Sequence, residues 1–395
     1  MRRSALAAVA VVSMVVPPAA AGAELPLGPR SLDEQRASAR VAPGVRWTRI
    51  VREGGPWRVN VLSVARSARV LVAPAGEIGT RGRPSAVSRR LRAVAAVNGG
   101  YFGADGNPVG VLAAGGRLLS EPVGGRSALM LGAPPRIAAL RFEGTVSVGG
   151  QAALLDGANR VPGEIPACGG RGGDLPTERP DAVTTCSDPS EVVLFTPEWS
   201  GRTPGARGAR TDVVVRGGVV SAARSRGATR IPGDGYVVAG TGAAARMLRA
   251  AAGSGVPVAL DPAIGPGLGT GIVGGGPRLL ARGRVRVRSS AEGFDPLSAP
   301  WFHDSFVAAR QPRTLAGVRA DGRLLLVTID GRRPGWSAGV TLREAGRVMR
   351  SLGARTALNL DGGGSSAMAV RGRVVSRPSD PSGERPVSDV LVVLP

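Results

Sequence analysis

The residues best suited to chemistry lie in the glycine-rich stretch 357–368. There an expected short strand ends at Asp361, Gly362–Gly364 follow, and Ser365 and Ser366 come next. Three consecutive glycines lose much conformational entropy on folding, so a chain keeps them where the backbone must bend sharply or a ligand must come close. A carboxylate, backbone N–H groups and two hydroxyls suit an oxygen-rich ligand such as a sugar, a phosphate or a hard metal ion. The alternative is an Asp-Gly hairpin turn, which we expect for the other Asp-Gly pairs of the chain.

A second junction of this kind is Asn98-Gly99-Gly100-Tyr101-Phe102, which follows an apolar strand expected over 94–97. It combines an amide, a permissive backbone and two aromatic rings on which a sugar can stack. A hairpin turn with two core aromatics explains the same residues, and the motif alone leaves both interpretations open.

The C-terminal region predicts elements that position two aspartates. Leu324–Ile329 is typical of a strand that ends at Asp330, Thr341–Glu344 is a capping box that opens a helix, and a strand over 357–360 then leads to Asp361. Strand, helix and strand predict a right-handed parallel crossover, which brings both aspartates to one sheet edge. On neighbouring strands about 4.8 Å apart, the two carboxylates could flank one reacting bond. A strand inserted between them would weaken this hypothesis.

For the whole chain we predict an α+β fold, with a mixed β-sheet and flanking helices that include the C-terminal crossover. Arg2 and Arg3 precede a short apolar run and an A-x-A cleavage site, so residues 1–23 are interpreted as a secretory signal peptide. A polar leader over 24–54, with a short helix at 32–39, and a single domain over 55–395 follow. We expect no transmembrane segment, and the oligomeric state stays open.

Two cysteines, Cys168 and Cys186, lie in a loop excursion expected around 162–189. In an exported chain they predict a disulfide, which would contribute about 3 kcal/mol for a loop of this size. A paired-thiol metal or redox site would call for C-x-x-C spacing, which is absent.

The composition narrows the function classes. The net charge is +22, and the sequence contains no lysine, which excludes a Schiff-base lysine and a Walker loop. A single histidine, His303, excludes a multi-histidine zinc site. The arginines are spread evenly, and aromatic residues make up only 3%, so we expect no nucleic-acid partner. A cationic exported protein is instead drawn to anionic polymers such as phosphorylated wall glycans. The composition looks bacterial.

Five motifs, in order, resemble the signature of the phosphodiester glycosidase family. They are Asn98–Phe102, Gly274–Pro277, Arg313-Thr314 with Gly317, Asp330-Gly331-Arg332, and Leu360–Ser366. Asn159-Arg160 and Phe195-Thr196-Pro197 are similar to the family's middle section. The resemblance covers roughly residues 55–395 and is densest after residue 270. It implies an α+β fold and a hydrolase that cleaves a sugar-1-phosphodiester at the glycosidic carbon.

The resemblance also implies roles for the candidate catalytic residues. Asp361 and Asp330 would be nucleophile or general base, Arg313 a two-pronged phosphate clamp, and Asn98 a hydrogen-bond donor to phosphate or sugar. The separation of the carboxylates would distinguish retention from inversion, and the sequence does not supply it. The expected substrate-binding residues are Gly99, Gly100, Tyr101, Phe102, Asn159, Arg160, Gly362, Gly363, Gly364, Ser365 and Ser366.

Two other functions fit parts of the sequence. A non-catalytic exported protein could use the same loop to bind a wall glycan or a structural divalent cation, calcium or magnesium, through Asp361 and Asp330. A phosphodiesterase that cuts at phosphorus would usually need two metals and a histidine-rich cluster. We expect the glycosidase, with a phosphorylated carbohydrate as substrate and a secreted or cell-wall location; no cofactor is assigned.

Overall fold

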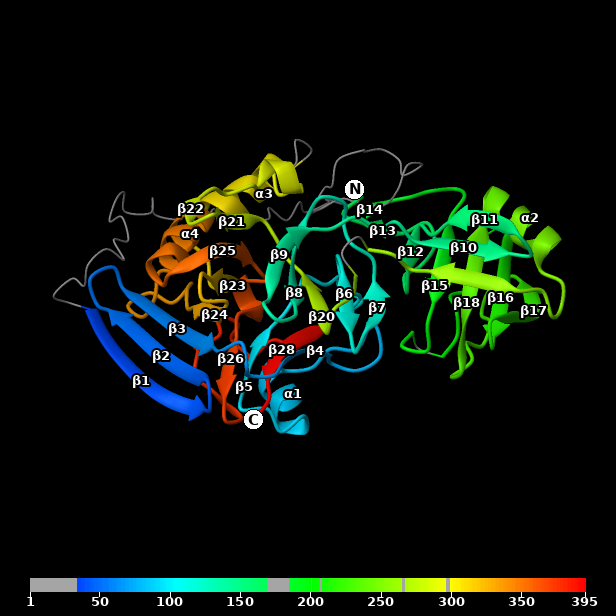
Figure 1. The fold of residues 1–395 in the computed structure, drawn as a ribbon. Helices are drawn as coiled ribbons and strands as arrows, with labels where there is room; N and C mark the ends of the chain where they lie inside the picture. Colours follow the sequence, from blue (N-terminus) through cyan, green and yellow to red (C-terminus); the bar gives the residue numbers. More distant parts are fainter. Residues whose placement is uncertain (1–33, 169–184, 200, 207, 265–266, 296–298) are drawn as a thin grey trace, which may run out of the picture.

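The structure is a computed structural model that describes residues 34–168, 185–199, 201–206, 208–264, 267–295 and 299–395. The predicted signal peptide over 1–23 lies outside these residues. An elongated molecule results, with sheets at one end and in the middle and a smaller lobe at the other end (Figure 1).

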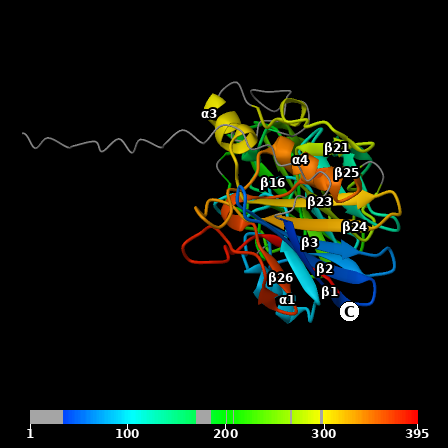
Figure 2. The same ribbon diagram turned by 90° about the vertical axis from the view of Figure 1, so that its left-hand side faces the viewer.

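The largest sheet has eight strands, and each neighbouring pair is antiparallel. Figure 2 looks onto the end of the molecule that this sheet forms. In spatial order its strands are β1 (Glu34–Ala42), β2 (Val45–Arg52), β3 (Trp57–Val64), β24 (Leu324–Ile329), β23 (Arg313–Arg319), β25 (Ala354–Asn359), β21 (Arg278–Ala281) and β22 (Arg284–Val285).

The N-terminal region corrects one prediction. Residues 34–52 form the hairpin β1–β2 on the edge of this sheet, so the helix expected at 32–39 is wrong. The hairpin pairs along its whole length, from Glu34 opposite Arg52 to Ala42 opposite Val45, and β2 pairs in turn with β3. These long-range backbone hydrogen bonds outweigh the weak local preference for a helix.

Two five-stranded sheets pack beside the large one. The first has the order β27 (Arg373–Val374), β26 (Met368–Val370), β5 (Ala95–Asn98), β28 (Asp389–Val393) and β4 (Val70–Pro74), with α1 (Pro84–Arg90) against it. The second has the order β7 (Arg117–Ser120), β6 (Leu112–Ala114), β20 (Gly271–Gly274), β8 (Ser127–Leu131) and β9 (Arg136–Ala139).

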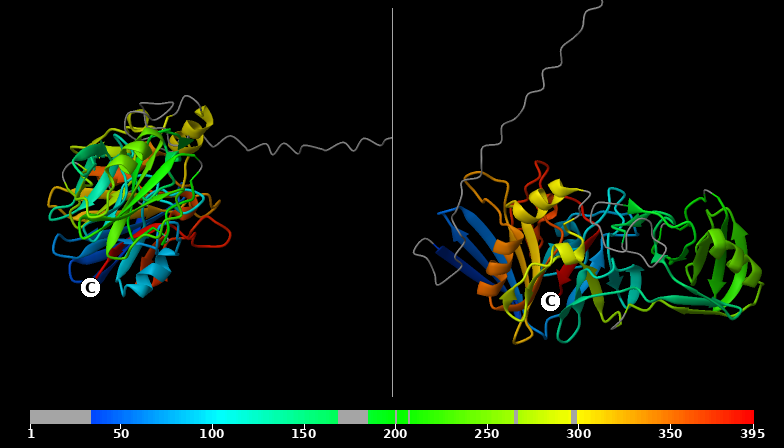
Figure 3. Two further views of the ribbon diagram at one scale, coloured as in Figure 1. Left: turned by 90° about the vertical axis from the view of Figure 1, so that its right-hand side faces the viewer. Right: turned by 90° about the horizontal axis from the view of Figure 1, so that it is seen from above.

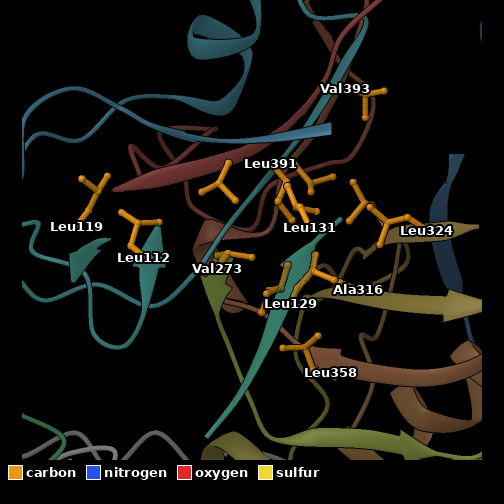
Figure 4. Close-up of a cluster of buried hydrophobic side chains, with 14 of the residues drawn as sticks. Leu112, Leu119, Leu129, Leu131, Val273, Ala316, Leu324, Leu358, Leu391 and Val393 are labelled. Atoms are coloured by element: carbon orange, nitrogen blue, oxygen red, sulfur yellow. The ribbon is translucent and has the colours of Figure 1, made fainter. Parts of the chain in front are cut away.

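One hydrophobic core joins the three sheets (Figure 4). Leu324 and Leu358 of the large sheet, Leu391 of β28, and Leu129 and Val273 of the second small sheet all belong to it. Burial of such side chains stabilises the fold by about 1.5–3 kcal/mol each. The core therefore fixes the positions of strand ends that come from distant parts of the chain.

The lobe at the other end is formed by residues between β9 and β20 (Figure 3). Its strands are β10 (Thr145–Val148), β11 (Gln151–Leu154), β12 (Gly157–Ala158), β13 (Ile165–Pro166), β14 (Thr185–Cys186), β15 (Val192–Phe195), β16 (Arg210–Arg216), β17 (Val219–Ser225), β18 (Gly235–Thr241) and β19 (Val258–Asp261), with helix α2 (Gly242–Ala251). The predicted disulfide between Cys168 and Cys186 is present here. The only parallel pair among the described strands is β12–β15. Strands outnumber the few short helices, so the fold is richer in β-structure than the predicted α+β class.

The C-terminal crossover is present in modified form. Strand β24 leads into helix α4 (Leu342–Ser351), which leads into β25. Both strands pair antiparallel with β23, so they run parallel to each other with β23 between them. The remaining short helices are α3 (Pro300–Phe302), a π-helical turn η2 (His303–Ala308), and the 3₁₀ turns η1 (Ser290–Glu292) and η3 (Gly363–Ser365).

Helix α4 begins with the predicted capping box, in which the Thr341 side chain accepts from the Glu344 N–H and the Glu344 carboxylate accepts from the Thr341 N–H. We expect Thr341→Ala to lower the free energy of unfolding by about 1 kcal/mol, because one N–H of the first turn loses its acceptor. Urea unfolding measures this. Thr341→Ser keeps the oxygen and should stay close to wild type; an equal loss in both variants would contradict the capping role.

Candidate active site

The five motifs converge around the start of β23. Backbone hydrogen bonds join Leu360 N–H to the Thr314 carbonyl at 2.8 Å, and Gly363 N–H to the Pro312 carbonyl at 2.9 Å. Asp361 N–H donates to the Gly99 carbonyl at 3.1 Å, and Gly276 N–H donates to the Asn359 carbonyl at 2.8 Å. The Asp330-Gly331-Arg332 motif lies against the same segments, because Gly331 packs on Pro312 and the Arg332 guanidinium lies over Gly363. Segments far apart in sequence thus form one site.

Asn98 is the internal connector of this site. Its Nδ2 donates to the Asp361 carbonyl at 2.7 Å. Its Oδ1 accepts from Thr314 Oγ1 at 2.6 Å and from Ala367 N–H at 3.1 Å. The residue is fully buried, so its amide holds the Asp361 loop against β5 and β23, and is not positioned as the substrate donor that the resemblance implied.

Asp361 is the half-buried carboxylate at the centre of the site. Burial raises its pKa to about 6, and the neighbouring Asp389 also raises it. The Ser365 hydroxyl, the Gly362 N–H, which donates to Oδ1 at 2.9 Å, and Arg385 lower the pKa and only partly offset burial. A carboxylate that changes charge near neutral pH is typical of catalytic acids, bases and nucleophiles.

Asp330 lies on the other side of β23 and is differently engaged. Its Oδ2 accepts from Trp336 Nε1 at 2.9 Å and its Oδ1 from Arg377 N–H at 3.1 Å. Burial raises its pKa, and these two donors oppose the rise. Because β24 and β25 are two strand spacings apart, the backbones of Asp330 and Asp361 are separated by about 10 Å.

Strand alternation also directs the two aspartates to opposite faces of the sheet. Asp361 continues the row of Ala357, whose side chain packs in the core beneath α4, whereas Asp330 continues the row of Leu326, which packs in the core between the sheets. The predicted pair of carboxylates flanking one bond therefore does not form.

Arg313 is buried without a carboxylate partner among the described residues. Its Nε donates to the Val340 carbonyl at 3.2 Å, and its Nη2 to the carbonyls of Phe306 and Ala309 at 2.5 and 3.3 Å. Burial lowers its pKa to about 10, so it stays charged at neutral pH. Only Nη1 is left for a ligand, so the two-pronged clamp expected from the resemblance is not available.

Three further arginine and serine features surround the Asp361 loop. Arg332 is exposed beside Gly363, and Arg385 pairs with Asp380 at 2.8 Å directly on Gly364. A Cβ at Gly364 would lie 2.2 Å from Arg385 Nη2, so a larger residue there would displace this ion pair. The hydroxyls of Ser365 and Ser366 are buried without a hydrogen-bond partner of standard geometry.

An aromatic series runs from the site to the surface. The Tyr101 hydroxyl donates to the Gly276 carbonyl and accepts from Asn359 Nδ2, both at 2.7 Å. Burial, followed by the charge of Asp361, raises the Tyr101 pKa, so the phenol stays protonated. The rings continue outward in the order Tyr101, Phe294, Phe306, Phe302 and Trp301, with centroids 5.1–6.0 Å apart at each step, and Trp301 is 65% exposed.

Asp389 is a residue of the site that the sequence analysis did not single out. Asp389 is buried and accepts from Gly100 N–H at 3.0 Å, and a Cβ at Gly99 would lie 1.8 Å from its Oδ1. The signal in the sequence was a Ser-Asp pair at the start of an apolar strand. Asp389 fixes the Gly99-Gly100 turn, which in turn holds Asp361.

Several predicted substrate-binding residues face elsewhere. Phe102 packs in the small core under β4 and β28. Asn159 bonds with Leu119 and Thr196 in the lobe. Arg160 is buried between Glu121 and Glu191 and lines a separate cavity of about 380 Å³. None of these contacts is with the Asp361 loop.

The oxygen ligands around Asp361 do not fit a calcium- or magnesium-binding site. Such cations take six or more oxygen ligands, usually with several carboxylates. The nearest acidic group, Asp389, is occupied by Gly100 N–H and the Ser388 hydroxyl. Within the described ranges, no group of three or more histidine, cysteine, aspartate or glutamate side chains could hold a metal ion.

Two solved structures share this fold. A crystal structure of a candidate exported protein from Burkholderia pseudomallei K96243 is similar with a TM-score of 0.82 and 28% identity, covering 95% of this chain and 99% of that one. A hypothetical protein from Synechocystis shares the fold with a TM-score of 0.71 at 22% identity, over 91% of this chain and 63% of that one.

The C-terminal part of the chain matches a known family. Residues 209–394 match the model of the phosphodiester glycosidase family, which confirms the predicted resemblance for this part of the chain. Among curated proteins, the SPbeta prophage-derived uncharacterized protein YomE of Bacillus subtilis (strain 168) is 40% identical over 84 residues, which is 21% of this chain and 13% of that relative.

Because the pKa of Asp361 is raised, we expect the free energy of unfolding to depend on pH. The unfolded pKa is about 3.9 and the native one about 6, so the native state binds the proton more tightly, and stability falls as pH rises from about 4 to above 6. We expect Asp361→Asn to raise the free energy of unfolding at pH 8 by up to about 3 kcal/mol, and little at pH 4.

Urea unfolding at both pH values measures this effect. The exposed Asp304 serves as control, since Asp304→Asn should change stability equally little at pH 4 and pH 8. A gain for Asp361→Asn that is independent of pH would contradict a carboxylate strained by burial.

Proposed function

We propose that the protein is an exported glycosidase that hydrolyses a sugar-1-phosphodiester on a cell-wall or capsular glycan. The sugar is released and a phosphomonoester remains. The observation that carries the proposal is the half-buried Asp361 carboxylate, with a pKa of about 6, at the start of a glycine loop that packs against the side chains of Arg313 and Arg332. The family match of residues 209–394 supports the reaction class.

A single well-placed carboxylate suffices for this reaction. Asp361 either takes the proton from an attacking water or itself attacks the anomeric carbon, while the bond from that carbon to the phosphate oxygen breaks and its electrons go to that oxygen. After direct attack, water hydrolyses the ester between the sugar and Asp361 and frees the sugar. The departing phosphomonoester has its second pKa near 6, so it leaves as an anion without a general acid. The second carboxylate of ordinary glycosidases is thus dispensable, and the turned-away Asp330 fits a supporting role.

The arginines and the loop would bind the phosphate. The donors available for this are the exposed Arg332 beside Gly363, the Ser365 and Ser366 hydroxyls, and Arg313, whose Cδ lies next to Gly362. In a partly buried site, such donors stabilise the negative charge that develops on the leaving oxygen. Asn98 and Tyr101 act indirectly, since both hold the strand ends that carry Asp361 and Asn359.

Export is part of the proposal. The predicted signal peptide, the Cys168–Cys186 disulfide and the similarity to a candidate exported protein support it. In the part of the chain that the structure describes, no helix is long and apolar enough to cross a membrane.

The reaction is tested with the mature protein and a sugar-1-phosphodiester. We expect free sugar and an intact phosphomonoester, and Asp361→Asn should lower kcat/KM by about 10²–10⁴-fold. Because Asp361 must be ionised, kcat/KM should rise with pH through an apparent pKa of about 6.

Asp304→Asn is the matched control and should keep wild-type activity. Release of a sugar phosphate would show cleavage at phosphorus, and binding without turnover would show a glycan-binding protein; either result contradicts the proposal. The anomeric configuration of the first-formed sugar distinguishes a nucleophilic from a general-base role for Asp361.

The exposed Trp301 predicts a sugar platform at the outer end of the aromatic series. We expect Trp301→Ala to raise KM about 3- to 10-fold with little change in kcat, since one stacking contact contributes about 0.5–1.5 kcal/mol. Trp301→Phe keeps a ring and should lose less. Steady-state kinetics on a substrate with a sugar aglycone decide, and unchanged KM in Trp301→Ala would refute the platform.

A further inference from the structure

A large basic groove lies on the far side of η2 from Arg313. Its volume is about 750 Å³, within the range of about 300–1,000 Å³ typical of ligand sites. Figures 1 and 2 show α3, α4 and β21 grouped at this end of the molecule. The lining residues are Arg284, Val285, Arg286, Val287, Ser289, His303, Val307, Ala308, Thr341, Arg343, Arg347 and Arg350.

Two rows of arginines form its charged walls. Arg343, Arg347 and Arg350 are spaced i, i+4 and i+7 on α4, which places them on one helix face. Arg284 and Arg286 alternate with apolar residues that pack beneath α4. The rows come close because Gly346 allows tight packing, since a Cβ there would lie 2.9 Å from Val285 Cγ1.

Four arginines of this groove keep their positive charge without an acidic partner. Arg284, Arg286, Arg343 and Arg350 have no side-chain hydrogen-bond or ion-pair partner among the described residues, and all four are exposed. In the part of the chain that the structure describes, no aspartate or glutamate lines the groove.

The acidic side chains near the groove are either paired with other residues or exposed to solvent. Glu344 is paired with Arg310 at 2.6 Å and caps α4. Glu292 is buried under Ser127, and Asp304, beside His303 at 3.4 Å, is exposed to solvent. The guanidinium groups of Arg284, Arg286, Arg343 and Arg350 repel one another, and an anionic ligand relieves that repulsion.

The groove is joined to the candidate active site by one segment. The Phe306 and Ala309 carbonyls accept from Arg313, while Val307 and Ala308 of the same turn line the groove. A chain of linked sugar phosphates leaving the Asp361 site past η2 would enter it. Among the described residues, the only aromatic ring in the lining is the imidazole of His303, so the groove lacks the series of stacking rings typical of single-stranded nucleic-acid sites.

We propose that this groove binds further phosphodiester units of a polymeric, anionic glycan while one linkage is hydrolysed at Asp361. The inference rests on the proposed function. It assigns the substrate class as a polymer and gives the groove the role of a holding site for phosphates that are not cleaved.

The test uses a fluorescein-labelled tetramer of hexose-1-phosphate units joined as phosphodiesters, a single unit of it in the form of a hexose-1-phosphate methyl diester, and a thymidine oligonucleotide with the same charge as the tetramer. Binding is followed by fluorescence anisotropy at about 0.15 M salt in the Asp361→Asn protein, and turnover of the single unit is measured in the otherwise wild-type protein. The groove variant is Arg284→Gln, Arg343→Gln and Arg350→Gln together. The control variant, Arg224→Gln, Arg230→Gln and Arg246→Gln, removes the same charge from exposed positions of the lobe.

We expect the groove variant to weaken tetramer binding about 10- to 30-fold and to reduce the salt dependence of that binding, because fewer counterions are released. The control variant should change it less than about threefold, and both should hydrolyse the single unit like wild type. Equal weakening by both variants would overturn the groove as a site. Oligonucleotide binding as tight as tetramer binding, lost in the groove variant alone, would reassign it to nucleic acid.

The two proposals can fail separately. If wild type does not hydrolyse the single unit, the proposed function fails, whereas tetramer binding that depends on the groove still stands as an observation. If hydrolysis is normal and the groove variant binds the tetramer like wild type, only the groove proposal is overturned.

Discussion

The three hydrogen bonds of the Asn98 amide connect everything else in the site. They tie β5, the start of β23 and the backbone on both sides of the glycine loop, through the Asp361 carbonyl and the Ala367 N–H. In a buried position, an unsatisfied amide would cost about 1–3 kcal/mol for each lost partner. Each of the three segments therefore needs the other two in place, and the loop cannot move independently of the sheets.

This rigidity explains how Asp361 can be kept at high energy. A carboxylate with a pKa near 6 is disfavoured in its charged form, and a flexible loop would relieve that cost by turning it to water. Here the Asp361 N–H is held by the Gly99 carbonyl, and Gly99 is covered by Asp389. The free energy for this arrangement comes from the hydrophobic core that joins the sheets, a division of roles between core and site that is common in enzymes.

Local patterns predicted the elements well where they depended on neighbouring residues. Strand β24, the disulfide and the Thr341 capping box follow from alternation, cysteine context and capping chemistry. These local patterns do not predict which strands pair with one another in a sheet. The insertion of β23 between β24 and β25, which separates Asp330 from Asp361, depends on long-range packing. The covering of Gly99 by Asp389, nearly three hundred positions later, left no local signal either.

The lobe between β9 and β20 has a consequence for how such proteins can diversify. The chain leaves the second small sheet after β9 and returns to it in β20, with only β8 between the two strands. An excursion whose ends lie this close can change in length or sequence without moving the rest of the sheet. Its core nevertheless continues into Ala113, Met130 and Ile272 of that sheet. Evolution can therefore exchange this lobe for another of similar apolar footprint, but cannot simply delete it. The site around Asp361 stays constant while the lobe varies.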